Sequence, residues 1–288
     1  MTTAYIDTFS GVSGDMLLGA LVDVGLPLEE LQAALDTLGV EGLRLSSAVE
    51  RRSGLGATRV MVDYPPQHEH RHLKHIVSLI EASSLPEEVK GRSVDVFLRL
   101  AEAEAEIHRI DPQRVHFHEV GAADAIADVV GTVFGFHHLD IDEILVGPVN
   151  VGAGLVRCEH GLLPVPAPAT LALLVGWTCR SAGPKRELTT PTGAALVTTL
   201  GQQVESFPTL RVTRVGYGAG GADTPEWPNL LRVVLGEPVA TGMQGPRPHE
   251  AHGHGYGHGY AHGHQHEQQH NHGHERQHDH EHTRKEQA

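Results

Sequence analysis

The segment from Val115 to Gly131 joins a strand-like and a helix-like periodicity within one short sequence, V-H-F-H-E-V-G-A-A-D-A-I-A-D-V-V-G. Its first residues alternate as strand residues do, so His116 and His118 share one face of a predicted strand. After Gly121 the apolar residues recur at helical spacing and give a predicted helix its apolar side. A strand that leads directly into a helix indicates an α/β fold.

The same segment carries a candidate metal site. Asp124 and Asp128 are four residues apart, so they are neighbours on one side of the predicted helix. Two imidazoles leaving a strand and two carboxylates at the start of the next helix can meet around one turn, and this ligand set suits a divalent transition metal. The alternative is that the aspartates complement the positive end of the helix dipole while His116 and His118 pack in a half-buried strand.

Strands and helices continue to alternate on both sides of this segment. Strands are predicted at Ala4–Phe9, Leu43–Tyr64 (two strands joined around Ser53–Gly56), Ile144–Val151, Leu155–Glu159, Thr178–Ser181, Leu210–Val215 and Leu230–Leu235. Helices are predicted at Met16–Val24, Pro27–Leu38, Leu73–Ala82, Pro86–Ile110, Ala169–Val175 and Gly193–Leu200. Ser13 and Thr190 are expected to cap helices, and the glycine-rich Gly216–Gly221 to separate the last two strands. We therefore predict a mixed, layered α/β domain over residues 1–240.

A histidine-rich tail is predicted over residues 241–288, where glycine, histidine, glutamine and glutamate leave almost nothing to bury, so this segment should be disordered. Of the 23 histidines in the chain, 13 lie between His249 and His282. Closely spaced imidazoles on a flexible chain can chelate nickel, copper or zinc, and binding should weaken below a pH of about 6.5. The candidate ligands include His252, His254, His262, His264, His266, His272 and His274.

The overall charge and the cysteine content exclude several classes of protein. A formal net charge of −14 argues against non-specific binding to nucleic acid or to an anionic membrane, because both need a basic surface. No apolar run approaches the roughly 20 residues of a membrane span, and the N-terminus lacks the features of a signal peptide. Two cysteines are too few for a disulfide framework, so we expect a reducing cytoplasm.

Two loops resemble seats for an anion. Each follows a predicted strand or loop and precedes a predicted helix, whose first N–H groups have no partner within the helix. The candidate residues are Ser10, Gly11, Ser13, Gly14 and Asp15 in the first loop, and Thr189, Thr190 and Thr192 in the second. Neither loop is a Walker loop or a G-x-G-x-x-G fingerprint, and a well-capped tight turn is the alternative for both.

Further polar clusters have two interpretations each. A cluster at a helix entrance contains either additional metal ligands or a solvated linker, and its residues are His68, His70, His72 and His75. Cys158 and His160 are two apart on a predicted strand, where they could bind a soft metal or act as a nucleophile, although a lone cysteine is more often a buried small group. The carboxylates Glu102, Glu104 and Glu106 are expected to form a solvated helix face.

Five segments of the chain carry a family resemblance. They are D-T-F-S-G-V-S-G-D-M at Asp7–Met16, R-H-L-K at Arg71–Lys74, V-H-F-H-E-V-G-A-A-D-A-I-A-D at Val115–Asp128, C-E-H-G-L-L-P-V-P-A-P-A-T at Cys158–Thr170 and E-L-T-T-P-T-G-A-A at Glu187–Ala195. Together, and in this order, they resemble the nickel-insertion protein family of the lactate racemase system (LarC). The resemblance covers essentially all of residues 1–240.

The resemblance implies an enzyme that inserts nickel into pyridinium-3,5-bisthiocarboxylic acid mononucleotide. Nickel–sulfur and nickel–carbon bonds would form in a pincer cofactor, in the manner of a chelatase or cyclometallase of the lyase class, for a lactate racemase-type apoenzyme. Family members depend on CTP, with assistance from manganese or magnesium. Fuller members continue into a C-terminal domain thought to hold the CTP–metal site, so this chain resembles their N-terminal portion. Either a companion chain completes it, or it handles nickel without CTP.

The implied chemistry assigns roles to the candidate residues. His116 and His118 with Asp124 or Asp128 would hold nickel, and one of the two loops would hold the phosphate. Forming a nickel–carbon bond at the pyridinium ring displaces a proton, so a base such as Glu119 or His160 is needed. One alternative is a nickel storage or delivery chaperone without chemistry of its own. Another, suggested by the carboxylates and the first loop, is a metal-dependent phosphate-ester hydrolase.

Overall fold

The computed structural model of the chain describes residues 1–65, 72–115, 117, 122–222, 224 and 226–239. The predictions for His68, His70, His116, His118, Glu119 and the tail histidines lie outside these residues. The predicted domain boundary at residue 240 and the predicted disorder of the tail lie outside them as well. None of the described helices is both long enough and apolar enough to cross a membrane.

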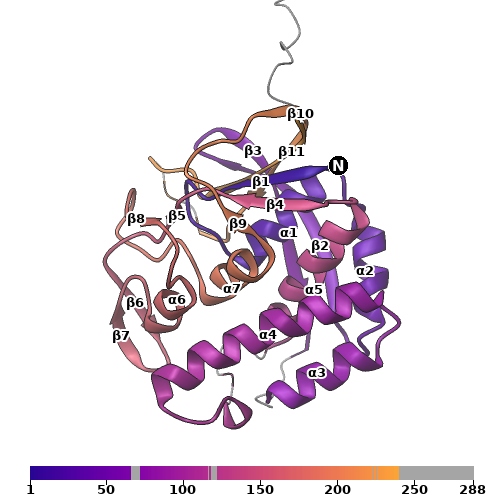
Figure 1. Cartoon of the computed structure of the whole chain (residues 1–288), viewed down its shortest axis with the longest axis vertical. Helices are drawn as coiled ribbons and strands as arrows, with labels where there is room; N and C mark the ends of the chain where they lie inside the picture. The colour runs from indigo at the N-terminus through magenta and orange to yellow at the C-terminus, as the bar shows by residue number, and fades with distance from the viewer. Residues whose placement is uncertain (66–71, 116, 118–121, 223, 225, 240–288) are drawn as a thin grey trace, which may run out of the picture. The chain divides into compact units, whose positions relative to one another are not determined.

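A mixed sheet of seven strands forms one layer of the described fold, in the order β2-β3-β10-β11-β1-β4-β9 (Figure 1). β1 pairs antiparallel with β11 and parallel with β4, so the two kinds of pairing meet at one strand. The strands are β1 (Thr3–Asp7), β2 (Arg44–Arg52), β3 (Leu55–Asp63), β4 (Glu143–Val146), β9 (Gln202–Gln203), β10 (Leu210–Ala219) and β11 (Leu230–Pro238). The predicted mixed α/β fold is therefore confirmed.

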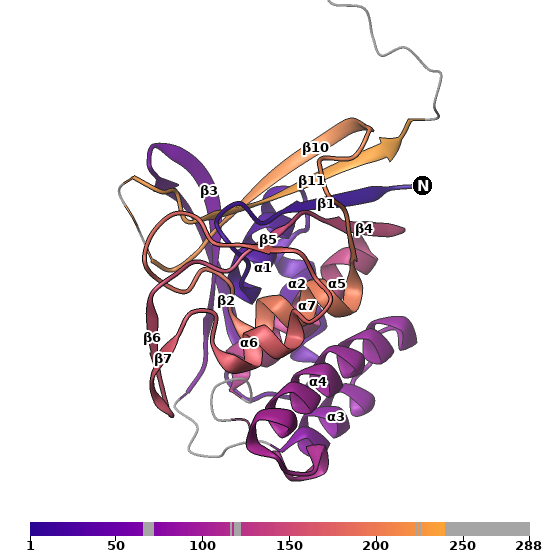
Figure 2. The ribbon, with the colours of Figure 1, turned by 60° about the vertical axis from the view of Figure 1, so that its left-hand side comes forward.

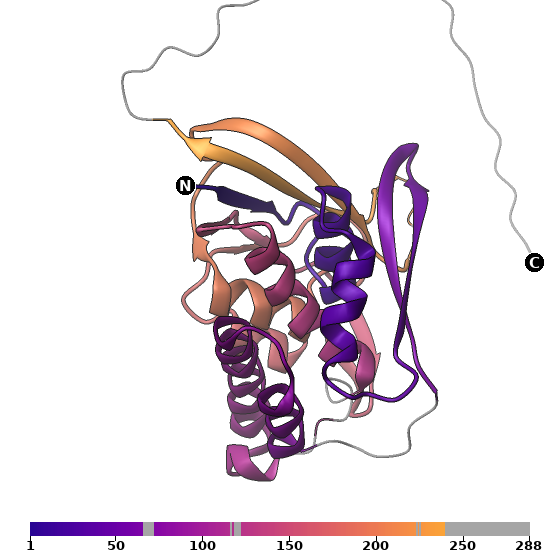
Figure 3. The same cartoon turned by 90° about the vertical axis from the view of Figure 1, so that its right-hand side faces the viewer.

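Helices lie on one side of this sheet in two layers (Figures 2 and 3). The inner layer consists of α1 (Gly14–Asp23), α2 (Leu28–Asp36), α5 (Ala123–His138) and α7 (Pro191–Leu200). The outer layer consists of α3 (Leu73–Ala82) and α4 (Glu87–His108), followed by the short 3-10 helix η1 (Pro112–Arg114). The main core lies between the sheet and the inner helices and continues to α4, where Phe97 is fully buried.

A smaller region between α5 and α7 supplies one side of the candidate site. It contains two short sheets, β5 (Val149–Asn150) with β8 (Cys179–Arg180) and β6 (Leu155–Cys158) with β7 (Gly161–Pro164), and the helix α6 (Pro168–Leu173). The prediction of one strand over Ile144–Val151 is wrong, because β4 and β5 are separate strands of different sheets. Between them lies Pro148, which has no N–H to donate to a strand ladder.

The strand prediction is also wrong for the described residues of the segment that begins at Val115. Neither Val115 nor Phe117 belongs to a strand. The Val115 N–H donates to the carbonyl of Pro112 (3.2 Å), and the Phe117 ring packs near Phe97 of α4, with 6.4 Å between ring centroids. The two described apolar members of the alternation are therefore buried side chains that belong to no strand. The helix predicted after it is confirmed as α5.

The first four residues of the predicted glycine-rich loop, 216–219, belong to β10, which corrects the prediction, whereas Gly220 and Gly221 follow the strand. α1 packs directly on this strand, and a Cβ at Gly218 would lie 1.8 Å from the carbonyl oxygen of Met16. A Cβ at Gly216 would likewise lie 2.4 Å from the carbonyl oxygen of Ala20. The glycines thus allow a helix to approach the sheet closely. Because this requirement comes from tertiary packing, the local sequence pattern wrongly predicts a loop here.

This close approach predicts a large loss of stability for Gly218→Ala. The added methyl group would overlap backbone atoms of α1, which cannot move without separating the helix from the sheet. We expect the free energy of unfolding to fall by about 3 kcal/mol or more, measured by urea denaturation. The matched control is Gly56→Ala in β3, where a Cβ would meet nothing within 4 Å. Equal stabilities of the two variants would contradict this account of the packing.

Candidate functional site

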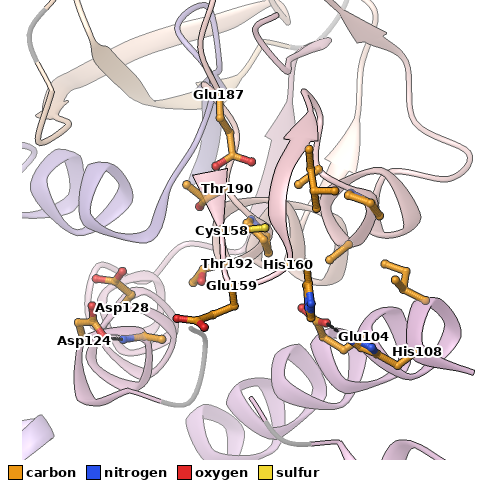
Figure 4. A pocket seen from close by; sticks show the side chains of 17 residues that line it. Glu104, His108, Asp124, Asp128, Cys158, Glu159, His160, Glu187, Thr190 and Thr192 are labelled. Carbon is orange, nitrogen blue, oxygen red and sulfur yellow. Dashed lines mark hydrogen bonds and ion pairs between the residues drawn. The ribbon is translucent and has the colours of Figure 1, made fainter. Parts of the chain in front are cut away.

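A cavity of about 370 Å³ lies where α4, α5, α6 and α7 meet the β6–β7 hairpin (Figure 4). Its polar lining contains five carboxylates, two imidazoles, one thiol and two threonine hydroxyls, and no lysine or arginine is among the described lining residues. These side chains are Glu104, Asp124, Asp128, Glu159, Glu187, His108, His160, Cys158, Thr190 and Thr192. The cavity therefore concentrates negative charge and favours a cation.

One side of the cavity is formed by the first two turns of α5, where Asp124 and Asp128 lie near each other as their spacing predicts (Figure 4). The Oδ1 atom of Asp124 accepts a hydrogen bond from the N–H of Ala125 (2.8 Å), so this carboxylate satisfies one N–H of the helix start. Asp128 lies one turn further on, against α1, because a Cβ at Gly14 would be 2.4 Å from the Asp128 Cβ.

The Asp128 carboxyl group is electrostatically strained. The residue keeps part of its surface open, but its Oδ1 atom is buried and has no hydrogen-bond partner. Burial raises the pKa of the Asp128 carboxyl well above its usual range, and the carboxylates of Asp15 and Asp124 raise it further. A divalent cation in the cavity would offset this repulsion, so Asp128 is the described side chain whose environment most favours a positive ligand.

Another part of the cavity lining brings together two imidazoles from distant parts of the sequence. On α4, Nε2 of His108 lies 3.5 Å from Oε2 of Glu104, one helical turn earlier. The His160 ring approaches from the β6–β7 hairpin, with 4.8 Å between the two ring centroids. His108 was not among the predicted site residues, and Glu104 was expected on a solvated helix face. The available signal was their spacing of four residues, which places both on one side of a helix.

The hairpin also corrects the placement of Cys158 and His160. Cys158 ends β6, whereas His160 lies in the turn before β7, so the two residues do not share one strand face. Both nevertheless line the cavity. The Cys158 Sγ atom is 3.7 Å from the carbonyl oxygen of Gly161, which holds the thiol close to the turn.

The second predicted anion loop reaches the cavity with two of its three threonines. Thr190 caps α7 as predicted, because its side chain accepts a hydrogen bond from the N–H of Gly193 (3.2 Å). Thr190 and Thr192 both line the cavity. Thr189 instead is fully buried, and its hydroxyl donates to the carbonyl of Asn150 (2.8 Å). A phosphate role for this loop therefore remains a prediction for Thr190 and Thr192.

The residues of the first predicted anion loop do not line the cavity, although Gly14 packs against Asp128 of the lining. Ser10 is fully buried, and its hydroxyl accepts a hydrogen bond from Nε1 of Trp227 (2.9 Å). Ser13 occupies the N-cap position of α1, but its hydroxyl donates to the Asp15 carboxylate and accepts no hydrogen bond from a helix N–H, so the predicted side-chain cap is wrong. Gly11 is closely packed against Leu188, and Gly14 against Asp128. The carboxylate of Asp15 here disfavours a phosphate, so this prediction gains no support from the geometry.

The described residues contain no group of three or more histidine, cysteine, aspartate or glutamate side chains arranged to hold a metal ion. The predicted ligands Asp124 and Asp128 are brought together, but His116 and His118 lie outside the described residues. His72 is the N-cap residue of α3 and lines a different cavity, with its ring centroid 5.6 Å from that of His75. The described part of the candidate site is therefore a charged cavity whose imidazoles and aspartates come from different elements.

Comparison with known proteins identifies the family. A family model described as nickel insertion protein matches residues 4–279. The chain belongs to the nickel insertion protein family. Two relatives named pyridinium-3,5-bisthiocarboxylic acid mononucleotide nickel insertion protein, from Desulfitobacterium hafniense and Geobacillus kaustophilus, are 48% and 43% identical over 253 and 256 residues. These matches cover 87% and 85% of this chain but only 63% and 62% of the relatives. No solved structure gave a significant match.

In this member of the nickel insertion protein family, three of the five segments that carry the resemblance converge on the cavity. Val115–Asp128 contributes the two aspartates of α5, Cys158–Thr170 contributes the β6–β7 hairpin and the start of α6, and Glu187–Ala195 contributes the start of α7. A fourth segment, Asp7–Met16, contacts the Asp128 side chain through Gly14. Segments that are far apart in the sequence thus assemble one site, which supports the cavity as the functional centre.

Proposed function

We propose that this chain takes part in nickel insertion into pyridinium-3,5-bisthiocarboxylic acid mononucleotide. The observation that carries the proposal is the carboxylate-lined cavity, which is built from the segments that carry the family resemblance. The curated relatives that the chain matches bear this activity in their names, and the chain spans less than two thirds of their length. A nickel ion is the substrate that the charge of the cavity favours.

In this proposal the two parts of the cavity lining have different roles. The carboxylates of Asp124 and Asp128 receive nickel, since binding of a cation relieves the repulsion that raises the pKa of Asp128. His116 and His118 would complete the ligand set, because imidazole suits nickel. Forming the nickel–carbon bond releases one ring proton, and His160 or Glu119 accepts it. Glu104 orients His108 beside His160.

We further propose that CTP, with manganese or magnesium, acts on a part of the system outside this chain. The matched region covers 63% and 62% of two of these relatives, and in this proposal the function of the remaining part is supplied by a companion chain. The companion would give the pair the full activity of a lyase-class cyclometallase. The finished cofactor would then pass to a lactate racemase-type apoenzyme.

The experiment that tests this function is reconstitution of cofactor formation. The chain is combined with nickel, the mononucleotide, CTP, manganese and the C-terminal region of a relative, and the product is detected by mass spectrometry. We expect His160→Ala to lower the rate by about 100-fold, the lower range for loss of a general base. The matched control is His138→Ala, which removes an exposed imidazole at the far end of α5. Unchanged turnover in His160→Ala would remove that residue from the mechanism.

Nickel storage or delivery is the second candidate function, and the histidine-rich tail favours it. It predicts that the chain binds several nickel ions but forms no cofactor in the reconstituted mixture. The His116→Ala/His118→Ala variant separates the two functions, because it should lower cofactor formation while leaving most of the bound nickel in place. Cofactor formation by the chain and the C-terminal region would exclude storage as the sole role.

A further inference from the structure

A second cavity has the opposite charge. It has a volume of about 450 Å³ and lies between the start of α3 and the residues that follow α4, where it is lined by His72, Lys74, Ile110, Gln113 and Arg114. No carboxylate is among these described lining residues, in a chain whose formal net charge is −14. The contrast with the carboxylate-lined cavity indicates a different ligand.

The cations of this second cavity are available to a ligand. Lys74 and Arg114 are exposed, and within the described residues neither side chain makes an ion pair or a hydrogen bond. Asp111, the carboxylate nearest in sequence to Arg114, uses its Oδ1 atom to accept a hydrogen bond from the N–H of Gln113 (2.8 Å). Arginine and lysine are the side chains that proteins use to bind phosphate, the first through a planar fork and the second as a point charge.

The start of α3 adds to this positive field. α3 has 10 residues, its N-cap residue His72 makes no side-chain cap hydrogen bond, and its first turn contains no acidic residue. The N–H groups of the first turn therefore contribute a partial positive charge next to Lys74. Backbone and side chains thus act in the same direction, which is the arrangement that binds an anion.

We infer that the second cavity binds the phosphate group of the mononucleotide substrate, an inference that rests on the proposed function. The carboxylate-lined cavity repels a phosphate, whereas Lys74 and Arg114 attract one. This inference therefore stands against the phosphate role predicted for Thr190 and Thr192, which line the carboxylate-lined cavity. Both cavities are lined by the stretch from Glu104 to Arg114, the first by α4 and the second by the residues just after it. In this arrangement the carboxylate-lined cavity holds the cation and the second cavity holds the phosphate, so neither ligand lies among side chains of its own charge.

The test measures anion binding directly, without nickel and without a companion chain. The full chain is titrated calorimetrically at low ionic strength with nicotinamide mononucleotide, inorganic phosphate and CTP. We expect the Lys74→Gln/Arg114→Gln variant to bind nicotinamide mononucleotide at least about tenfold more weakly than the parent chain, because two charge-assisted contacts are lost. The matched control is Arg51→Gln, which removes an exposed charge from β2, away from the lining of either cavity.

The three ligands distinguish the sources of the phosphate. Tighter binding of nicotinamide mononucleotide than of phosphate or CTP, lost in the double variant, supports a mononucleotide site. Equal binding of all three, again lost in the variant, supports a phosphate site, and preference for CTP would assign it to the triphosphate and overturn the mononucleotide assignment. No binding by the parent chain, or binding that is unchanged in the variant, overturns the site altogether. Cofactor formation is measured separately, so the proposed function can stand if this site fails.

Discussion

Asp128→Asn is expected to weaken nickel binding at the carboxylate-lined cavity by at least about tenfold while making the protein more stable. The loss follows because one anionic ligand is removed, and charge-assisted contacts are worth about 1.5–3 kcal/mol. The gain follows because the variant has no buried carboxylate to ionise near Asp15 and Asp124. A substitution that only damaged the fold would lower both quantities, so the opposite signs identify the role of this residue.

The gain in stability has a defined pH dependence. Burial and the nearby carboxylates raise the pKa of the folded Asp128 carboxyl well above its usual range, so the unfolded chain loses its proton first as the pH rises. The parent chain is therefore progressively destabilised from about pH 4 up to the raised pKa, by about 1.4 kcal/mol for each pKa unit of difference. The variant escapes this penalty, so its advantage should be larger at pH 8 than at pH 4.

Both quantities can be measured on the same proteins. Nickel binding is followed by calorimetry in full-length chains whose tail histidines are replaced by glutamine, and stability by thermal unfolding at the two pH values. Each kcal/mol should raise the melting temperature by about 2–4 °C for a domain of this size. The matched control is Asp140→Asn, an exposed aspartate in the turn after α5 with a φ of 50°, a conformation that asparagine tolerates. Equal gains at pH 4 and pH 8 would contradict the assigned cause.

The sequence predicts those parts of the fold that depend on local pattern. The helix after Gly121, the cap at Thr190 and the shared side of Asp124 and Asp128 are all confirmed, because spacing and capping act within one or two turns. The β2–β3 hairpin is confirmed for the same reason. In these places a short range of sequence contains both the signal and the structure it determines.

The sequence fails where a distant element decides the outcome. Gly218 continues a strand only because α1 packs on it, about 200 residues away in sequence. The Ser10 hydroxyl accepts a hydrogen bond from the Trp227 side chain, more than 200 residues away in sequence. His108 has His160 beside it because the β6–β7 hairpin packs near the end of α4. These contacts join parts of the chain whose approach no local periodicity records. The carboxylate-lined cavity was therefore predictable in its α5 part and not in its α4 part.

Replacing the 13 tail histidines with glutamine is expected to remove about three quarters of the nickel that the chain binds at pH 7.5. If about four imidazoles hold each ion, the tail binds roughly three ions and the carboxylate-lined cavity one. The parent chain should release the tail-bound ions near pH 5.5, about one unit below the usual imidazole pKa, whereas the variant has none to release. Equilibrium dialysis at the two pH values measures both effects.

The matched control for the tail keeps every histidine and replaces its glutamates and glutamines with serine, so that length and polarity are preserved while acidic and amide groups are removed. This control should retain the nickel capacity of the parent chain, since the imidazoles supply the ligands. Undiminished nickel capacity in the variant that lacks the tail histidines would place the bound nickel elsewhere in the chain.

The variant that lacks the tail histidines also separates collection of nickel from its insertion. If the tail only raises the local concentration of the ion, cofactor formation should be lost at limiting nickel and recovered at saturating nickel. Loss at both concentrations would instead make the tail part of the insertion site itself.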